Sequence, residues 1–484
     1  MAKPLPEPGS EKGLEQKRRA ARQRLHEMFD QWLDQVEGDL GAEAPTLERV
    51  TQAIWERRHE LTGQITEVLI AEAHGDALEQ QTCPCPHCGR GLSARRGSPR
   101  RVETKVGAVS LRRPYFYCVA CGRGFSPVDA TLELSPRCKQ WDLQQAGARL
   151  AVEVPYATAS ALLGELTGLP VSDHTLHEIV GEISQGLTVE QVCPSREEIQ
   201  AWVTQVAAGK TWRPIVVLAL DGADVPTRPE RAQGGRPGRK KQRAHRARWQ
   251  GEWREAKGFR FYLVEGERIV HLGSWHQVQS PAQLGEALRQ VQAAGLIPEE
   301  QVRLCGIADG ARWIWPLVQE LFPTAVQVLD YYHCSEHLYQ VAGAQFADQP
   351  EQQREWMEAT LTRLFCGQVA AVLQELPQWV ARDDPAAEEI RKLIVYLTEN
   401  QKRVNYGFAR RGGYPLGSGG IESANKFISH VRLKRSGAWW YVERANGMLA
   451  LRCAKYNGTF DRVFEAYKQR VLQKSYSNGS VTNA

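Results

Sequence analysis

Two pairs of cysteines constrain the fold of this chain more than any other feature. Cys85 and Cys88 form the first C-x-x-C pair, and Cys118 and Cys121 form the second after 29 intervening residues. A glycine follows each pair and permits the tight turn that lets two thiolates face one ion. Two such turns complete a tetrahedral site, so the spacing predicts a structural Zn²⁺ in a zinc ribbon over residues 82–129. Two unrelated buried cysteine pairs are the alternative.

The composition argues against a membrane protein and against a disulfide framework. The chain has 484 residues, of which 42% are hydrophobic, as is typical of a multidomain globular protein. Its apolar runs are far shorter than the roughly 20 residues of a bilayer-spanning helix, and no apolar signal region follows the first Met. Its cysteine count, 11, is odd, which argues against a set of paired disulfides. We therefore expect a cytoplasmic protein with no membrane partner.

One basic segment predicts a polyanionic partner. The net charge of +5 is too small to indicate a partner, but residues 228–248 hold nine Lys and Arg against one acid. Such a segment attracts backbone phosphates without reading bases. We expect a mobile loop that binds DNA through Arg239, Lys240, Lys241 and Arg243. Arginines between the two cysteine pairs would give the ribbon a basic face as well: Arg95, Arg96, Arg100, Arg101, Arg112 and Arg113.

A pair of helices is predicted after the cysteine-rich segment. Apolar residues recur with helical spacing over residues 156–181, with a short Gly-Leu-Pro interruption. Ser172 is a good cap for the second helix, and residues 172–177 would form its exposed start. This pattern is typical of a helix-turn-helix whose second helix reads DNA. Plain packing of two helices explains the pattern too, so both interpretations stay open.

The second half of the chain predicts a mixed sheet. Three antiparallel strands come first, and two strands that alternate with helices follow, at residues 209–220, 259–264, 268–272, 302–308 and 325–329. The segment after them, residues 335–405, carries helical periodicity only. This order indicates a mixed α/β core with a helical insertion, within a multidomain α+β chain.

Three acids occupy positions that could bring them together. Asp221 and Asp309 follow apolar strands, and Glu422 begins a helix after the glycine-rich loop 412–420. Acids that follow apolar strands lie at the edge of a sheet. Three converging carboxylates could hold two divalent ions about 4 Å apart for in-line phosphoryl transfer. Taken singly, both aspartates precede a glycine, and Asp-Gly is also a common turn.

Five segments carry a more specific pattern. They read LDG at 220–222, ADGARWIW at 308–315, VLDYYHCSEHL at 328–338, GSGGIES at 417–423 and RLKRSGAW at 432–439. These segments resemble bacterial insertion-sequence transposases of the ISKra-four family. The resemblance covers about residues 82–456. It implies a DDE transposase with a ribonuclease H-like core that a helical insertion interrupts before the last acid.

The resemblance also implies roles for individual residues. The family's catalytic acids fall on Asp221, Asp309 and Glu422, which would hold Mg²⁺ or Mn²⁺. Asp330 and His333 look like the D-x-x-H signature of related elements. The implied partner is double-stranded DNA, both element ends and target, bound by a homodimer at the bacterial nucleoid. In the last segment we expect DNA contacts from Arg432, Lys434 and Arg435.

Asp309 and Asp330 compete for the role of second acid, because both follow apolar strands. In a ribonuclease H-like order the fourth strand lies beside the first. An acid that ends the fourth strand therefore comes closer to Asp221 than one that ends the fifth, which lies a strand farther out, about 4.8 Å. We therefore choose Asp309 and expect Asp330 to orient His333 and the start of its helix.

Two other functions are compatible with the sequence. A non-enzymatic DNA-binding regulator would use the ribbon and the helix-turn-helix and treat the acids as structural turns. A hydrolysis-only ribonuclease H-like nuclease would cut without joining. We expect seven segments along the chain: an N-terminal helical region 1–81, the zinc ribbon 82–129, the helix-turn-helix region 140–190, the first part of the core 209–338, the helical insertion 339–411, closing helices with the last acid 412–474, and a disordered tail 475–484.

Overall fold

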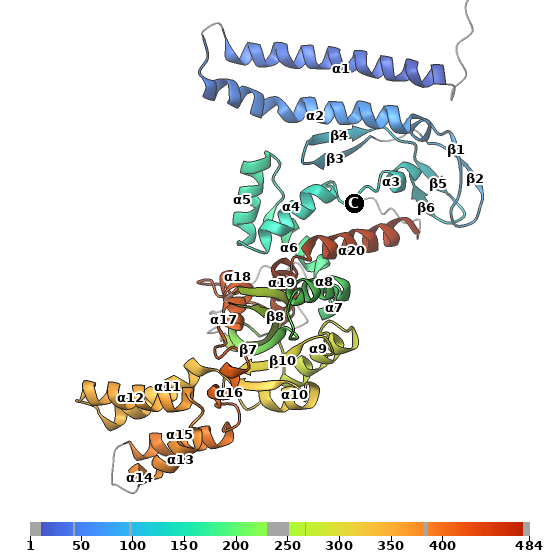
Figure 1. Ribbon diagram of the computed structural model, residues 1–484. Helices are drawn as coiled ribbons and strands as arrows, with labels where there is room; N and C mark the ends of the chain where they lie inside the picture. Colours follow the sequence, from blue (N-terminus) through green and yellow to red (C-terminus); the bar gives the residue numbers. More distant parts are fainter. Residues whose placement is uncertain are drawn as a thin grey trace, which may run out of the picture. The chain divides into compact units, whose positions relative to one another are not determined.

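The chain forms two compact units in the computed structural model, which is shown in Figure 1. One unit comprises Met1–Ile183 with Phe464–Ala484, and the other comprises Ser184–Val463. The division into seven smaller segments stays a prediction. The structure describes residues 11–41, 44–95, 99–229, 251–266, 268–380 and 386–477.

Two long antiparallel helices begin the first unit, as the helical periodicity predicted. They are α1 (Glu11–Leu40) and α2 (Leu47–Leu78). Thr46 caps α2 by accepting a hydrogen bond from the N–H of Arg49. Farther along, the Nε1 of Trp32 donates to the carbonyl of Arg57 at 3.1 Å, which ties the two helices together near their connection.

Each C-x-x-C pair lies in the turn of a small hairpin. The first hairpin is β1 (Thr82–Pro84) with β2 (Gly91–Ser93), and the second is β5 (Phe116–Cys118) with β6 (Arg123–Phe125). A third hairpin between them packs on α2. It consists of β3 (Arg100–Thr104) and β4 (Gly107–Leu111), and the short α3 (Pro127–Thr131) follows β6.

Two arginines of the expected basic face are internal. Asp129 in α3 is fully buried, and its carboxylate pairs with Arg100 at 2.6 Å and with Arg113 at 2.8 Å. A buried carboxylate requires such partners, because desolvation raises its pKa while the two guanidinium groups lower it. These two arginines therefore stabilise the module instead of facing DNA.

Three helices complete the first unit's central part, together with a C-terminal helix. They are α4 (Trp141–Ala151), α5 (Tyr156–Thr167) and α6 (Asp173–Ile183). Gly168 ends α5 in the left-handed region at φ 72°, and the hydroxyl of Ser172 accepts from the N–H of Thr175 at the start of α6. The geometry is helix, turn, helix, and its reading of DNA stays a prediction. The C-terminal elements are α20 (Phe460–Leu472) and η2 (Gln473–Ser477).

A five-stranded mixed sheet forms the centre of the second unit. Its order is β11-β10-β7-β8-β9, in which β7, β8 and β9 are antiparallel neighbours and β10 and β11 run parallel to β7. The fourth strand therefore lies beside the first, as predicted. The strands are β7 (Ile215–Thr227), β8 (Glu252–Glu265), β9 (Arg268–Val278), β10 (Arg303–Ala308) and β11 (Val326–Leu329).

The first three strands are longer than the sequence predicted. We expected Asp221 to end its strand, but β7 continues to Thr227 because β8 pairs with it residue by residue as far as Glu252. Gly222 is accordingly a strand residue, and the common-turn interpretation of Asp221-Gly222 is wrong. The basic segment falls between these two strands, and Arg239, Lys240, Lys241 and Arg243 lie outside the described residues.

Helices cover the sheet and extend from it (Figure 1). The small α7 (Val189–Val192) and α8 (Arg196–Ala207) precede the sheet, α9 (Pro281–Ala293) and α10 (Ile314–Leu321) connect its strands, and α19 (Val442–Tyr456) packs on β9. Helices follow β11, as the periodicity of residues 335–405 predicted: α11 (Tyr331–Gln345), α12 (Pro350–Phe365), α13 (Val369–Glu375), α14 (Pro377–Val380), α15 (Ala387–Glu399) and α16 (Tyr406–Arg411). The helical insertion at 339–411 as a separate segment stays a prediction.

The closing helices predicted over residues 412–474 are interrupted near their start. α17 (Gly419–Asn425) passes through one π-helical turn, η1 (Lys426–His430), into α18 (Val431–Leu433), and α19 begins only at Val442. The loop between them is held by β7, since Trp440 exchanges backbone hydrogen bonds with Pro226 and Arg228. Across the described residues, none of the helices is both long and apolar enough to cross a membrane.

Candidate functional site

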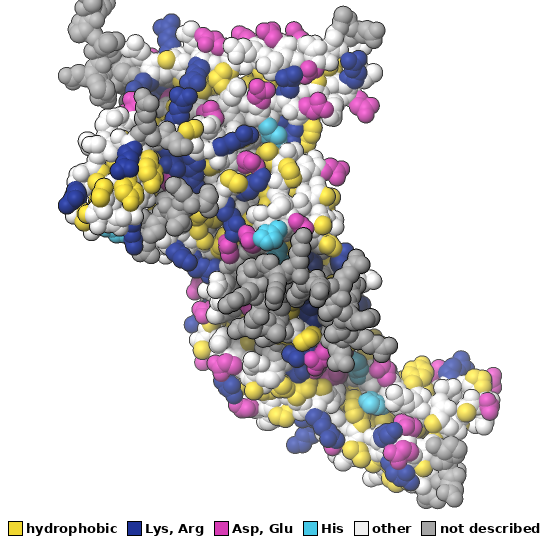
Figure 2. Space-filling model, turned by 180° about the vertical axis from the view of Figure 1, so that it is seen from behind, with side chains coloured by type: hydrophobic (Ala, Val, Ile, Leu, Met, Phe, Trp, Pro, Cys, Tyr) yellow, Lys and Arg dark blue, Asp and Glu magenta, His cyan; other side chains and the backbone are white. Residues whose placement is uncertain are grey.

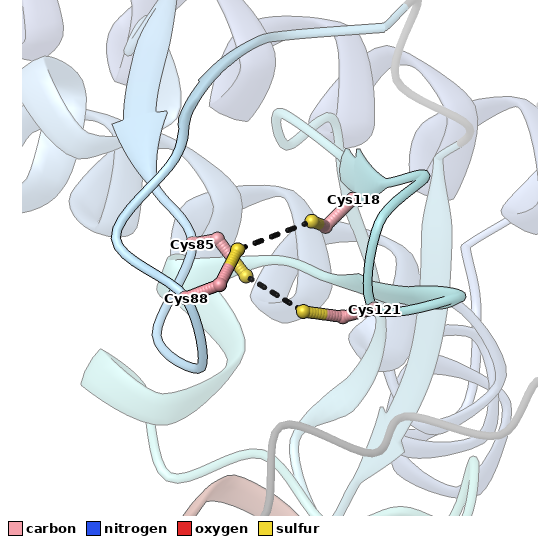
Figure 3. A group of neighbouring side chains, drawn as sticks. All are labelled: Cys85, Cys88, Cys118 and Cys121. Carbon is pink, nitrogen blue, oxygen red and sulfur yellow. Dashed lines mark hydrogen bonds between the residues drawn. The ribbon is translucent and has the colours of Figure 1, made fainter.

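The four cysteines come together at the tips of their two hairpins (Figure 3). The Sγ atoms of Cys85 and Cys121 are 3.9 Å apart, those of Cys88 and Cys118 are 3.6 Å apart, and all four lie within 4.8 Å of one another. A tetrahedral Zn²⁺ with bonds of about 2.3 Å would separate its sulfur ligands by about 3.8 Å. The group can therefore bind a metal ion such as zinc. Cys83 lies outside this group.

The backbone around the cysteine group favours thiolates. The N–H of His87 and then that of Cys88 lower the pKa of Cys85 to about 7. In contrast, the neighbouring cysteine side chains and burial raise the pKa of Cys121 to about 12. One thiolate thus forms readily near neutral pH, but four neighbouring thiolates would repel one another. A bound dication would remove that repulsion.

The register of the central sheet places Asp309 beside Asp221. β7 and β10 are parallel, and Ile307 pairs with Ala219. Asp221 lies two residues farther along β7, and Asp309 is the first residue after the end of β10. Neighbouring strands are about 4.8 Å apart. The two aspartates, 88 positions apart in sequence, therefore lie side by side at the point where β10 ends next to β7. Asp309 itself begins a turn and accepts a hydrogen bond from the N–H of Ala311 at 2.9 Å.

Burial and neighbouring charges perturb Asp221. Burial is the largest cause that raises its pKa to about 6, the N–H of Gly222 opposes it, and the charges of Asp309 and Glu422 raise the pKa further. The charge of His333 lowers the pKa of Asp221. The structure therefore brings Asp309, Glu422 and the signature histidine within range of the charge of Asp221. A carboxylate in this setting is ionised most easily when a cation shares its site.

Asn425 is a site residue that sequence reasoning missed. Its Nδ2 donates to Oδ2 of Asp221 at 2.6 Å, and it lies one turn after Glu422 on α17. Glu422 is exposed, and its Oε1 accepts a hydrogen bond from the hydroxyl of Ser418 at 3.2 Å. One short helix thus supplies an acid and orients another. The i to i+3 spacing of Glu422 and Asn425 would identify Asn425 from the sequence only if the helix were already known to face Asp221.

Asp330 connects backbone segments. It is fully buried, and its Oδ1 accepts the N–H of His333 at 2.9 Å, which caps α11. Its Oδ2 accepts the N–H of Ser418, at the start of α17. Both carboxylate oxygens of Asp330 therefore already accept hydrogen bonds from backbone N–H groups. This arrangement favours Asp309 over Asp330 as the second acid, and it matches the expectation that Asp330 orients the helix start at His333.

The three acids are less tightly gathered than the cysteines. Over the described ranges, the cysteine set is the one group of three or more His, Cys, Asp or Glu found to have ligand atoms close enough to hold an ion. Because Glu422 is exposed, its side chain has room to turn. The residue types still suit a hard divalent cation, since all three are carboxylates and each bears on the charge of Asp221.

The arginines and lysine expected to contact DNA fall into two groups. Arg432 is only 3% exposed, and its guanidinium lies over the ring of Trp440 at 5.0 Å. This burial removes Arg432 from any surface that could contact DNA, because packing against the indole and the helix uses its length. Lys434 and Arg435 are exposed in the loop after α18, and a role for them in DNA binding stays a prediction.

Comparisons with known proteins add little to this geometry. No protein-family model matches the chain, and no curated protein does. The chain is similar to the Drosophila P element transposase strand transfer complex, at 11% identity over 70% of this chain and 84% of that chain, with a TM-score of 0.24. It is also similar to the Mos1 transposase paired-end complex with left transposon end, at 13% identity, over 56% of this chain and 79% of that chain, with a TM-score of 0.14. Both weak neighbours are transposases, but at such TM-scores the likeness carries no argument.

The cysteine geometry predicts about one Zn²⁺ per purified chain. Elemental analysis of the wild type and of Cys118→Ser measures this directly. The serine removes a thiolate, so the zinc content should fall to a small fraction of the wild-type value. Cys366→Ser is the matched control, because Cys366 is exposed and is not one of the four cysteines of the group. Equal zinc in Cys118→Ser and wild type, or zinc in neither, would contradict the site.

The raised pKa of Asp221 predicts a pH-dependent cost in stability. Because the folded protein holds this proton more tightly than the unfolded chain, the free energy of unfolding decreases as pH rises from about 4 to about 6. The loss is on the order of 3 kcal/mol and persists above pH 6. Asp221→Asn cannot ionise, so in EDTA we expect it to be more stable than wild type near pH 7.5 and similar near pH 4. Urea unfolding at both pH values measures the difference. A variant no more stable than wild type near pH 7.5 would show that Asp221 is not buried as described.

Proposed function

We propose that this chain is a DDE transposase with a ribonuclease H-like catalytic unit. The observation that carries the proposal is that Asp309 and Glu422 bear on the charge of the partly buried Asp221, from two strands and a helix far apart in sequence. The strand order, with the fourth strand parallel to and beside the first, is the order a ribonuclease H-like unit requires. The resemblance of the surrounding segments to ISKra-four transposases is the reason to prefer transposition over other phosphoryl transfers.

Mg²⁺ or Mn²⁺ would be held by Asp221, Asp309 and Glu422. A bound pair of such ions would activate a water or a 3′-hydroxyl and stabilise the leaving oxygen. Other residues of the chain orient the three carboxylates through hydrogen bonds. Gly222 and Asn425 fix the two oxygens of Asp221, the turn at Ala311 fixes Asp309, and Ser418 orients Glu422.

DNA binding is proposed for three exposed regions of the chain. Lys434 and Arg435 lie on the loop after α18, in the same unit as the acids. The zinc ribbon and the helix pair α5 and α6 are the candidates for recognising element ends. The exposed face of α6 is partly acidic, and Arg137 pairs with its Glu178 and Glu182, so base reading would begin at its N-terminal residues.

Substitution of the acids tests the proposal. Asp221→Asn, Asp309→Asn and Glu422→Gln keep size but remove the charge that a divalent ion needs, so each should reduce Mg²⁺-dependent cleavage of end DNA by about a thousandfold or more. Binding of the same DNA, measured by mobility shift in EDTA, should survive. Joining of pre-cleaved ends to a plasmid target separates a transposase from a nuclease that only hydrolyses.

Asp330→Asn is the control that separates the two candidate aspartates. An amide oxygen accepts fewer hydrogen bonds than a carboxylate, so the variant should loosen Ser418 and lower the unfolding free energy by about 1–3 kcal/mol. Its cleavage defect should therefore accompany lower stability. If Asp309→Asn still cuts near the wild-type rate while Asp330→Asn is folded and inactive, the two aspartates exchange roles. If all variants cut or none binds DNA, the proposed function is wrong.

A further inference from the structure

Arg260 in β8 is a cation buried in the second unit. Lys and Arg side chains are common on the molecular surface that Figure 2 shows, where water solvates them. Arg260, by contrast, is only 6% exposed, and burial lowers its pKa. In the part of the chain that the structure describes, no carboxylate forms an ion pair with its guanidinium. Burying a guanidinium without a carboxylate costs free energy, so we expect its contacts to serve more than stability.

The contacts of Arg260 connect β9 to α17. Its Nε donates to Nδ1 of His271 in β9 at 3.2 Å, and its Nη1 donates to the carbonyl of Gly420 in α17 at 2.5 Å. The guanidinium also lies 5.2 Å from the ring centre of Tyr262 and 5.4 Å from that of Tyr456. Aromatic rings attract a cation, so two hydrogen bonds and two rings fix the position of this group.

His271 is a fixed acceptor for Arg260. Burial is the largest cause that lowers the pKa of His271 to about 4, so its imidazole is neutral near pH 7. Because Nδ1 accepts from Arg260, the proton lies on Nε2, which donates to Oδ1 of Asn457 at 2.9 Å. The N–H of Ser274 donates to the same oxygen, and Nδ2 of Asn457 donates to the carbonyls of Val192 and Ser274. A chain of buried hydrogen bonds therefore runs from β9 through Arg260 to α17.

Gly420 sets how closely α17 approaches the sheet. A Cβ at this position would lie 2.6 Å from the ring of Tyr262, which is fully buried and has no space to move aside. A Cβ on the neighbouring Gly419 would meet nothing within 4 Å. The start of α17 thus rests on Tyr262, and Arg260 holds its carbonyl there.

Arg260 and Asp221 lie on the same face of the sheet. Arg260 pairs with Ala219 in β7, and Asp221 follows Ala219 by two residues. Residues opposite each other on paired strands share a face, and so do residues i and i+2 of one strand. α17 packs on both β7 and β8. Since Glu422 is exposed, its place relative to Asp221 depends on the backbone of α17.

We propose that Arg260 is a positioning residue for Glu422. It holds the carbonyl of Gly420, two residues before the acid, and thereby sets the position of α17 over the sheet. The inference rests on the proposed function, in which Glu422 shares a divalent ion with Asp221. Arg260 acts through Gly420 and contacts neither the ion nor DNA. Replacing a residue that orients metal ligands from outside typically weakens metal binding about tenfold to a hundredfold.

Binding of Mn²⁺ alone to the full chain, followed by electron paramagnetic resonance, tests the inference without cleavage. Arg260→Met keeps the length of the side chain but removes its donors and charge, so Mn²⁺ should bind about tenfold or more weakly than to wild type. Arg260→Lys keeps the charge and one donor, so its affinity should lie between the two. Arg303→Met is the matched control. Arg303 also donates to a backbone carbonyl, that of Gly412, but it lies at the opposite end of β10 from Asp309. This control should bind Mn²⁺ as wild type does.

Two adjacent glycines test the same contact without a change of charge. Gly420→Ala would push α17 away from Tyr262 and should weaken Mn²⁺ binding about tenfold or more. Gly419→Ala adds the same methyl group where there is open space, so it should bind Mn²⁺ as wild type does. This pair decides the matter if the Arg260 variants do not fold.

Urea unfolding separates a positioning role from a purely structural one. If Arg260→Met lowers the unfolding midpoint while the folded variant binds Mn²⁺ as tightly as wild type, Arg260 is structural only and the inference is wrong. Equal Mn²⁺ affinity of Gly420→Ala and Gly419→Ala would also overturn it. A wild type whose Mn²⁺ binding is absent, or is unchanged by Asp221→Asn, would instead overturn the catalytic proposal and with it this inference.

Discussion

The parallel pairing of β10 with β7 is the constraint on which the candidate site depends. Ladder hydrogen bonds set this register, and a shift by one residue would turn Asp309 to the opposite face of the sheet from Asp221. The apolar residues of both strands resist such a shift, because they are buried from Val216 to Leu220 and from Leu304 to Ala308. The core packing thus decides the geometry of the acids.

The position of the third acid, Glu422, depends on interactions outside this strand pair. Glu422 lies on the seven-residue helix α17, whose Ile421 and Ala424 are fully buried. The start of that helix is also held by Asp330, which accepts a hydrogen bond from the N–H of Ser418. The far end is tied by Asn425 to Asp221. One buried carboxylate and one buried amide therefore hold α17 in place. Asp330, an acid of the sequence signature, therefore has a structural role through its backbone contacts.

Local patterns predicted much of this structure, and tertiary contacts decided the rest. The cysteine spacing identified its group because a C-x-x-C turn is complete within a few residues. The strands of the sheet were recognisable from their apolar runs. The length of β7 was not, since residues 222–227 extend only because β8 pairs with them. Likewise, the burial of Arg432 under Trp440 and the contact of Asn425 with Asp221 join distant segments, and nothing within a short window reports them.

The most direct test of the central claim asks where a divalent cation binds. Fe²⁺ can replace Mg²⁺ in sites made of oxygen ligands, and with ascorbate and hydrogen peroxide it cuts the polypeptide backbone close to the ion. Mass spectrometry of the fragments then maps the site. Cuts near Asp221, Asp309 and Glu422 that Mg²⁺ suppresses are the result we expect. Cuts confined to the region of Asp330 and His333, or cuts in none of these segments, would contradict a shared metal site where β10 ends beside β7.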